Sequence, residues 1–435
     1  MKAGFARALI TPPRATVMEG WTTRDLEQPA ASGVHDDLHA SALYVRHEGE
    51  EALIMGLDVL FFSREHADRM KGALGRVLDL SPRQILLNAS HTHAGPATSN
   101  YAHHYDLTPD WAYLNLMEQR LIDAALQARA GARDCTMSAG AARSRLPVSR
   151  RKPDGKGGVL WLPHPEGRVC DHLPLCLLRD RGSRPICLLY SVSCHPATVY
   201  GWEFSADFPG EARRRIDEHL GAPVSLFLQG MGGDTKASVV GEPRDGGEPR
   251  WRRGDWLDVE RAGAILASEL IEALRGGLTP VEPLVRTALL ETHWPLGPLP
   301  DRRELESLLT HEVQVRRQTA GRHLRWLDRG IELPTSASIL VQGAVLGRGV
   351  RIVALEGEPV GDLGRQILDA FAGGVTFPLG YSNGLGLYLV TTRMLREGGY
   401  EPESYYEYGY PAPLAEGTEV VLAAAIAELK LRGIG

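Results

Sequence analysis

The sequence predicts an α/β fold with mixed, mostly buried sheets and flanking helices. Two observations lead to this prediction. Apolar, strand-like runs alternate with helix-like segments three times along the 435 residues, and these runs are continuously apolar instead of alternating with polar residues. Hydrophobic residues make up 43% of the chain, which is enough for a large core. We expect residues 1–435 to form one catalytic domain.

The first two strand–helix–strand units share one layout. Residues 51–62 and 83–93 are the strands of the first unit, and the helix at 63–78 begins with Ser63 as a suitable N-cap. In the second unit, a strand at 184–196 runs to His195. A helix at 207–221 follows it and ends at Gly221, and the next strand covers 222–234.

The third unit consists of a strand at 350–359, a helix at 360–371 and an extended segment at 375–390. The rest of the chain is expected to pack around these three units, and its sequence predicts less about function. It is expected to contain packing helices at 108–131 and 255–276, an inserted mobile loop rich in Gly, Pro and charge at 239–256, and a charged helical segment at 301–328 that is either a surface helix pair or a lid.

Polar residues fall where the predicted strands end. Ligand sites in open α/β sheets form beyond the carboxyl ends of the strands, so residues that are distant in the chain can meet at one edge. The residues at these ends are Asp58, His91, His93, His195, Asp234, Glu358 and Tyr388. We therefore expect one site built from all three units.

The His-x-His pair is the strongest of these signals. In extended chain, His91 and His93 lie on the same side because side chains alternate with period two. His195 and Glu358 complete a nitrogen-and-oxygen set suited to Zn²⁺, and three protein ligands with a water describe a catalytic zinc site. A tyrosinate is an alternative fourth ligand. The other interpretation is that each histidine is a structural hydrogen-bonding group.

The composition argues against several partners. The net charge is −6, which gives no basic surface for nucleic acid. No run approaches the roughly 20 apolar residues that a membrane span needs, and the N-terminus has no signal-peptide pattern. The five cysteines are scattered without a Cys-x-x-Cys pair. These features predict a cytoplasmic protein with reduced thiols and a small-molecule substrate; they leave the oligomeric state open.

Several segments resemble the N-terminal catalytic domain of the neutral, non-lysosomal ceramidase family, and the resemblance extends over nearly the whole chain. The most specific is SHTHAGP at 90–96, which is similar to the family's T-H-T-H-S-G-P. The other segments are GFARALITPP at 4–13, GVHDDLHASALYV at 33–45, SCHPATVYGWEFSADFPGEARR at 193–214, LEGEP at 355–359 and YSNGLGLYLVTT at 381–392.

The resemblance implies a set of site residues. Zinc would be held by His91, His195, Glu358 and Tyr388, with Glu356 as a competitor for Glu358. His93 would be the nearby catalytic or substrate-orienting histidine. The two arginines at 150–151, Arg150 and Arg151, fall in the family's substrate-contacting region, and the sequence does not choose between them.

One segment departs from the family pattern. GMGGDTKAS at 230–238 stands where the ceramidases have G-D-V-S-P with a catalytic serine, and Lys236 takes the serine's place. Thr235 is not a simple substitute, because neighbours in extended chain face opposite ways. The chain also ends at Gly435, without the family's C-terminal β-sandwich. Both departures predict a substrate other than ceramide.

The predicted function is a zinc-dependent hydrolase that cleaves an amide, ester or lactam bond of a small substrate with metal-activated water. His93 would transfer a proton and Tyr388 would stabilise the oxyanion. Lys236 would bind a substrate carboxylate or phosphate, or counter charge in the intermediate.

Asp58 and Asp234 would orient histidines, or would be turn and cap residues. Tyr101, in the segment 98–111, would help to shape the pocket. Two other functions remain open: acyl transfer or condensation in a biosynthetic pathway, and ligand binding without turnover.

Overall fold

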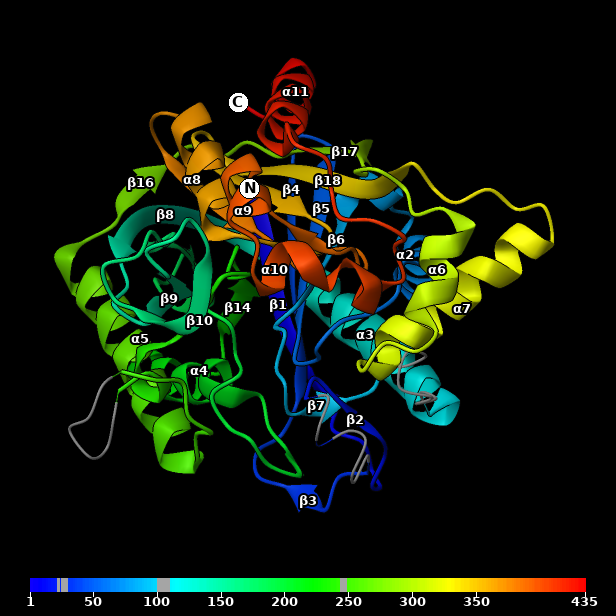
Figure 1. The fold of residues 1–435 in the computed structure, drawn as a ribbon. Coiled ribbons are helices and arrows are strands. Elements are labelled where there is room, and N and C mark those ends of the chain that lie inside the picture. The colour runs from blue at the N-terminus through cyan, green and yellow to red at the C-terminus, as the bar shows by residue number, and fades with distance from the viewer. Residues whose placement is uncertain (22–23, 25–29, 100–109, 243–248) are drawn as a thin grey trace.

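The larger of two stacked sheets has nine strands in a computed structural model that describes residues 1–21, 24, 30–99, 110–242 and 249–435 (Figure 1). Its strands, in spatial order, are β14 (Ser225–Gln229), β12 (Pro185–Val192), β11 (His172–Asp180), β8 (Arg133–Arg143), β1 (Lys2–Leu9), β4 (His39–His47), β5 (Glu50–Leu57) and β6 (Ile85–Ala89), with β16 (Thr279–Val281) paired to β8.

The second sheet lies face to face with the first. Its strands are β17 (Arg286–Pro295), β18 (Ser336–Gly347), β19 (Val350–Leu355) and β21 (Val375–Leu379). Alternate residues of each strand divide between two cores. On β4, Leu43 and Val45 join side chains of the second sheet in one buried cluster, whereas Ala42 and Tyr44 pack in a different one.

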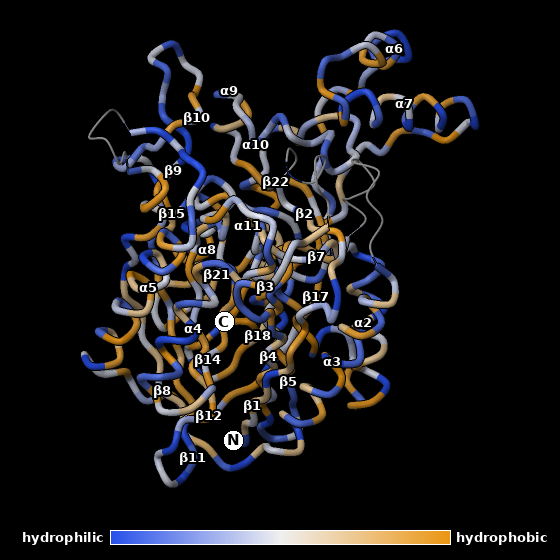
Figure 2. The backbone as a smooth tube through the Cα atoms, turned by 90° about the horizontal axis from the view of Figure 1, so that it is seen from below, coloured by the Kyte–Doolittle hydropathy of each residue, from blue (hydrophilic) through white to orange (hydrophobic). Residues whose placement is uncertain are grey.

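Helices cover the outer face of each sheet and complete four layers, α/β/β/α. The larger sheet is covered by α2 (Arg64–Leu78), α3 (Trp111–Ala130), α4 (Asp207–Leu220) and α5 (Trp256–Gly276). The smaller sheet is covered by α8 (Gly361–Ala370) and α11 (Thr418–Leu431), the red helix in Figure 1. Figure 2 shows hydrophobic residues concentrated along the strands. The predicted α/β class with flanking helices is confirmed.

Three parallel strand pairs, each joined through a helix, are the predicted strand–helix–strand units. They are β5–α2–β6, β12–α4–β14 and β19–α8–β21. The Ser63 hydroxyl caps α2 by accepting from the His66 N–H, and Gly221 ends α4 in the left-handed conformation at φ +68°. Parallel pairing brings the carboxyl ends of both strands of a unit to the same edge of their sheet.

Several short elements complete the fold. They are β9 (Pro147–Pro153), β10 (Val159–His164) and β15 (Thr235–Ala237) in one sheet; the pairs β20 (Glu358–Pro359) with β22 (Tyr388–Leu389), β2 (Met18–Glu19) with β7 (Gly95–Pro96) and β13 (Glu203–Phe204) with β3 (Gly33–Val34); and the helices η1 (Pro82–Gln84), η3 (Ser238–Val240), α9 (Thr392–Glu397), α10 (Tyr400–Glu403) and η4 (Ser404–Tyr408).

The charged segment at 301–328 forms two helices, α6 (Arg302–Leu308) and α7 (Gln314–Asp328). They pack on each other through Leu305, Ala320 and Leu324 and stand out from the body of the molecule (Figure 2). Among the described helices, none combines the length and the apolar character that crossing a bilayer requires.

Candidate metal centre

The two histidine segments leave the ends of β6 and β12. His91 follows the last residue of β6 by two positions, and its backbone is left-handed at φ +67°. The prediction that His91 and His93 share one side of an extended strand is therefore wrong. The rings converge because the chain turns at His91, and the turn is held by the His91 N–H bonded to the Val59 carbonyl at 2.9 Å and the His93 N–H bonded to the Pro196 carbonyl at 3.1 Å.

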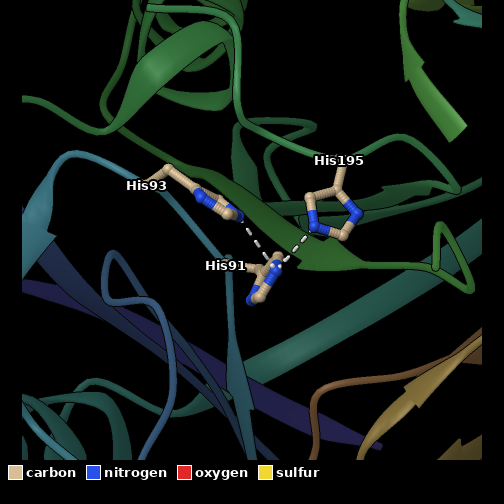
Figure 3. A group of neighbouring side chains, drawn as sticks. All are labelled: His91, His93 and His195. Atoms are coloured by element: carbon tan, nitrogen blue, oxygen red, sulfur yellow. Dashed lines mark hydrogen bonds between the residues drawn. The ribbon is translucent and has the colours of Figure 1, made fainter. Parts of the chain in front are cut away.

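The Nε2 atoms of His91, His93 and His195 face one another (Figure 3). His91 Nε2 lies 2.9 Å from His195 Nε2 and 3.3 Å from His93 Nε2. Each Nδ1 lies against a backbone carbonyl, at Leu60 (3.1 Å), Gly20 (2.6 Å) and Gly232 (3.0 Å) respectively for the three rings. A carbonyl only accepts, so each Nδ1 carries the proton and each Nε2 presents a lone pair.

Three lone pairs directed at one point repel each other unless a cation lies between them. Burial, with the neighbouring His91 ring next in effect, holds the pKa of both His93 and His195 well below the usual range, so these two rings are neutral. Neutral imidazoles with backbone-fixed tautomers are what a metal ion requires of histidine ligands.

Glu358 adds a carboxylate to the cluster. Its Oε2 is 3.3 Å from His91 Nε2 and 3.6 Å from His195 Nε2, and it is buried without a hydrogen-bond donor in the described chain. Its Oε1 accepts from the Tyr408 hydroxyl. Burial opposes ionisation of Glu358, whereas the hydrogen bond from the Tyr408 hydroxyl favours the carboxylate.

A tight turn presents Glu358 to the histidines. Gly357, just before it, has φ +88°, and a Cβ there would lie 2.5 Å from the Leu387 carbonyl oxygen. The competing Glu356 points elsewhere: it forms an ion pair with Arg64 and accepts from the Leu340 N–H at 3.0 Å. The geometry thus places Glu358, and not Glu356, beside the rings.

Tyr388 lies next to Glu358 because β20 and β22 pair in parallel, with these two residues in register. Its hydroxyl accepts from Arg150 Nη2 at 3.0 Å, and Arg150 Nε donates to Glu401 at 2.7 Å. The Arg150 guanidinium also lies 4.2 Å from the centre of the Trp161 ring. Arg151 instead donates to Glu401, to Glu397 and to the Gly398 carbonyl. Of the two arginines, the one that contacts Tyr388 is Arg150.

A pocket of about 490 Å³ opens over this cluster. Its walls include His93, His195, Arg150, Tyr388 and Lys236. Lys236 comes from β15, is only 7% exposed, and its ammonium lies 5.3 Å from the centre of the Trp21 ring. Burial, with Arg150 as the next cause, lowers the pKa of Lys236 to about 8.

Asp58 and Asp234, the two carboxylates predicted to orient histidines, contact other residues instead. Asp58 pairs with Arg213 at 2.7 Å and accepts from the His39 N–H at 2.8 Å, so it orients neither His91 nor His195. Asp234 accepts from the Gly361 N–H at 2.8 Å, at the start of α8. Asp234 thus acts as a cap, the second of the two interpretations of the sequence, whereas Asp58 forms a buried ion pair that neither interpretation included. Tyr101 lies outside the described residues.

The structure adds three residues that the sequence did not single out. Tyr408 donates to Glu358. Tyr381, at φ +52°, stacks at a tilt 4.3 Å from His91. Asn88 joins two units: its Nδ2 donates to the Gly380 carbonyl at 2.8 Å, and its Oδ1 accepts from the Gln229 N–H at 2.7 Å. The only available signal was that Tyr381 opens the quoted segment 381–392 and that Asn88 lies in the predicted strand at 83–93, two residues before SHTHAGP.

Comparison with known proteins bears on the fold. No protein-family model matches the chain. Among solved structures, the neutral ceramidase from Pseudomonas aeruginosa superimposes with a TM-score of 0.75 at 17% identity, covering 99% of this chain and 74% of that one. A ceramidase complexed with C2 gives a TM-score of 0.75 at 16% identity, covering 99% and 75%. The chain therefore has the fold of the neutral ceramidases.

A curated relative points in another direction. The tRNA modification GTPase MnmE of Halorhodospira halophila is 28% identical over 207 residues, which are 47% of this chain and 41% of that protein. The chain thus matches less than half the length of this relative. The sequence has no Gly-x-x-x-x-Gly-Lys-Ser/Thr phosphate loop, because its single Gly-Lys pair, Gly155–Lys156, precedes Gly157.

Proposed function

We propose that this chain is a zinc-dependent amidohydrolase that cleaves the amide bond of a small molecule other than ceramide. The observation that carries the proposal is the convergence of three imidazole Nε2 atoms and one buried carboxylate oxygen beside a pocket. The likeness in fold to ceramidases supports it, since a ceramidase acts on an amide. A related ester or lactam would meet the same chemistry.

The residues present fit a zinc ion. Ligands about 2.0–2.1 Å from a tetrahedral ion are spaced roughly 3.3 Å apart. The pairs formed by His91 Nε2, His195 Nε2 and Glu358 Oε2 are 2.9, 3.3 and 3.6 Å apart. These three residues would hold the ion and leave a fourth position toward the pocket. When bound, such an ion polarises a carbonyl oxygen and makes water a stronger nucleophile.

His93 would transfer the proton. Its Nδ1 donates to the Gly20 carbonyl, so its Nε2 is a free acceptor at the pocket wall. Water attacks the amide carbon as a C–O bond forms, and His93 takes the proton of that water. The C–N bond then breaks, and His93 returns the proton to the departing nitrogen, giving a carboxylic acid and an amine.

Tyr388 would stabilise charge on the carbonyl oxygen. Arg150 donates to the oxygen of the Tyr388 hydroxyl at 3.0 Å, which leaves the Tyr388 O–H available as a donor. The nearby guanidinium favours negative charge at this position. If Tyr388 were instead the fourth ligand, Tyr388→Phe would lower metal content as well as rate.

Metal analysis combined with amidase assays tests this function. Full-length protein loaded with Zn²⁺ should contain about one ion per chain and hydrolyse small anilides, with activity lost to a chelator. His195→Ala should lose the metal, whereas His93→Ala should keep it and lose activity. His219→Ala, an exposed histidine on α4, is the matched control and should change neither. Normal zinc content in His195→Ala would remove that ligand from the site.

We also propose the cellular location, the size of the substrate and the domain organisation of the enzyme. All five cysteines are free, as suits a reducing compartment, and we place the enzyme in the cytoplasm. The pocket volume of about 490 Å³ is that of a small-molecule site. Residues 1–435 would act as one catalytic domain.

A further inference from the structure

The ammonium of the mostly buried Lys236 side chain faces the pocket and has no acceptor among the described residues. Its side chain is 7% exposed, and the groups beside its Nζ are the rings of Trp21 at 5.3 Å and Trp251 at 5.5 Å. In the described chain, no hydrogen-bond acceptor reaches this ammonium and no carboxylate lies within 4.0 Å of it. An ammonium has three donors, and a buried charge without a partner is unfavourable. The site therefore favours an incoming acceptor.

The neighbouring charges leave Lys236 uncompensated. Arg150 and Arg151 are balanced by Glu401, which they share, and Glu397, which pairs with Arg151. Asp207 influences Lys236 from a distance, but its oxygens accept the backbone N–H groups of Thr198, Val199 and Phe208. One positive charge thus remains at the pocket wall, which matches a ligand with one negative charge.

Trp21 sets an upper limit on the distance between this charge and His93. Its ring centre lies 5.3 Å from the His93 ring centre and 5.3 Å from Lys236 Nζ. The two groups are therefore separated by no more than twice that distance. In an N-acyl amino acid the scissile carbonyl carbon and the carboxylate carbon lie within about 3.8 Å of each other, so such a molecule, with a hydrogen bond at each end, fits within this limit.

We propose that Lys236 binds a carboxylate of the substrate, so that the hydrolysed amide is that of an N-acyl amino acid or a similar N-acylated carboxylic acid. This inference rests on the proposed amidohydrolase function. The substrate's amide lies at His93 and His195, and its carboxylate lies at Lys236 between the Trp21 and Trp251 rings. A phosphate would bring two charges to a site that offers one.

Matched substrates test the proposal with the full-length, zinc-loaded protein. Each of a panel of N-acetyl amino acids is compared with its partner lacking the carboxylate, for example N-acetylphenylalanine with N-acetylphenethylamine. We expect kcat/KM to favour the carboxylate at least tenfold. Lys236→Met should lower kcat/KM for the carboxylate about 10- to 100-fold, as expected for a lost charge-assisted hydrogen bond, and leave the neutral partner within about threefold.

Two controls sharpen the result. Lys152→Met, on the adjacent strand β9, removes a lysine that does not line the pocket and should change neither substrate. The phosphonate analogue of N-acetylphenylalanine should be a poorer substrate than the carboxylate. Better hydrolysis of the phosphonate, or an equal loss for both substrates in Lys236→Met, would overturn the proposal.

Binding separates this inference from the hydrolase proposal. If no substrate of the panel is cleaved, the proposed function fails, and calorimetry with the same compounds still tests Lys236. Tighter binding of carboxylates than of their neutral partners, lost in Lys236→Met, would support the subsite alone. Binding that does not depend on the carboxylate in any pair would exclude it.

Discussion

Tyr408→Phe is expected to weaken metal binding without disturbing the fold. The hydroxyl of Tyr408 donates to Glu358 Oε1, and the other oxygen of that carboxylate faces His91 and His195. Removing the hydroxyl leaves Glu358 Oε1 buried without this donor and leaves the carboxylate free to rotate away from the histidines.

The size of the effect follows from the type of bond. A hydrogen bond to a charged group contributes about 1.5–3 kcal/mol. Each factor of ten in affinity is about 1.4 kcal/mol, so this range corresponds to roughly 10- to 100-fold weaker binding. Loss of a hydrogen bond that orients a metal ligand commonly has an effect of this same order, about 10–100-fold.

Competition with a chromophoric chelator measures the affinity, and circular dichroism monitors the fold. Tyr405→Phe is the matched control, because Tyr405 lies in the same short helix. Its hydroxyl accepts from Arg316 at 3.5 Å and does not contact Glu358. Zinc affinity of Tyr408→Phe within twofold of the parent would refute the argument that this hydroxyl orients Glu358.

Three further outcomes are expected. Asp58→Asn leaves the Arg213 guanidinium buried without its carboxylate and should lower the free energy of unfolding by about 3–5 kcal/mol in urea titrations; a loss under 1 kcal/mol would contradict this. Gly357→Ala meets a left-handed backbone and the Leu387 carbonyl, so it should destabilise the protein by about 1–3 kcal/mol or more and weaken zinc binding, both measured as above. Lys236 is charged only below its pKa of about 8, so kcat/KM for carboxylate substrates should fall as pH rises through 8, and Lys236→Met should lack this fall. The ionisable groups around Lys236 are Arg150, Asp207, Cys194 and His93.

The three crossover units could be predicted because their signals are local. Continuous apolar runs, such as the one that contains β5, are buried on both faces between helices and the second sheet. Ser63 and Gly221 mark helix ends through their own hydrogen bonding and backbone conformation. Parallel pairing brings the strand ends of one unit to one edge, but the units of His91 and His195 lie toward opposite ends of the larger sheet and Glu358 follows a strand of the smaller sheet. Their convergence therefore depends on how the sheets curve and stack, which the order of elements does not give.

Side-chain contacts between residues far apart in the sequence could not be predicted. Asp58 meets Arg213, which lies 155 positions away, and nothing in either segment indicates the pairing. Asp234 caps the backbone at Gly361 because β14 and α8 come together only in the folded chain. Tyr408 stands among several tyrosines at 400–410, and only the packing of η4 against Glu358 distinguishes it.

The backbone conformation of His91 depends on contacts with another segment, so it could not be predicted from the histidine motif alone. A left-handed backbone at a residue with a Cβ is unfavourable by about 1–2 kcal/mol, and it persists only where contacts over-determine it. Those contacts come from the segment after β5: the Val59 carbonyl accepts from the His91 N–H, the Leu60 carbonyl accepts from Nδ1, and the Phe61 ring packs at 4.7 Å. Tyr381 encloses the other side at 4.3 Å. One turn thus fixes both the tautomer and the direction of the His91 ring, and the apolar segment that holds this turn carries no motif of its own.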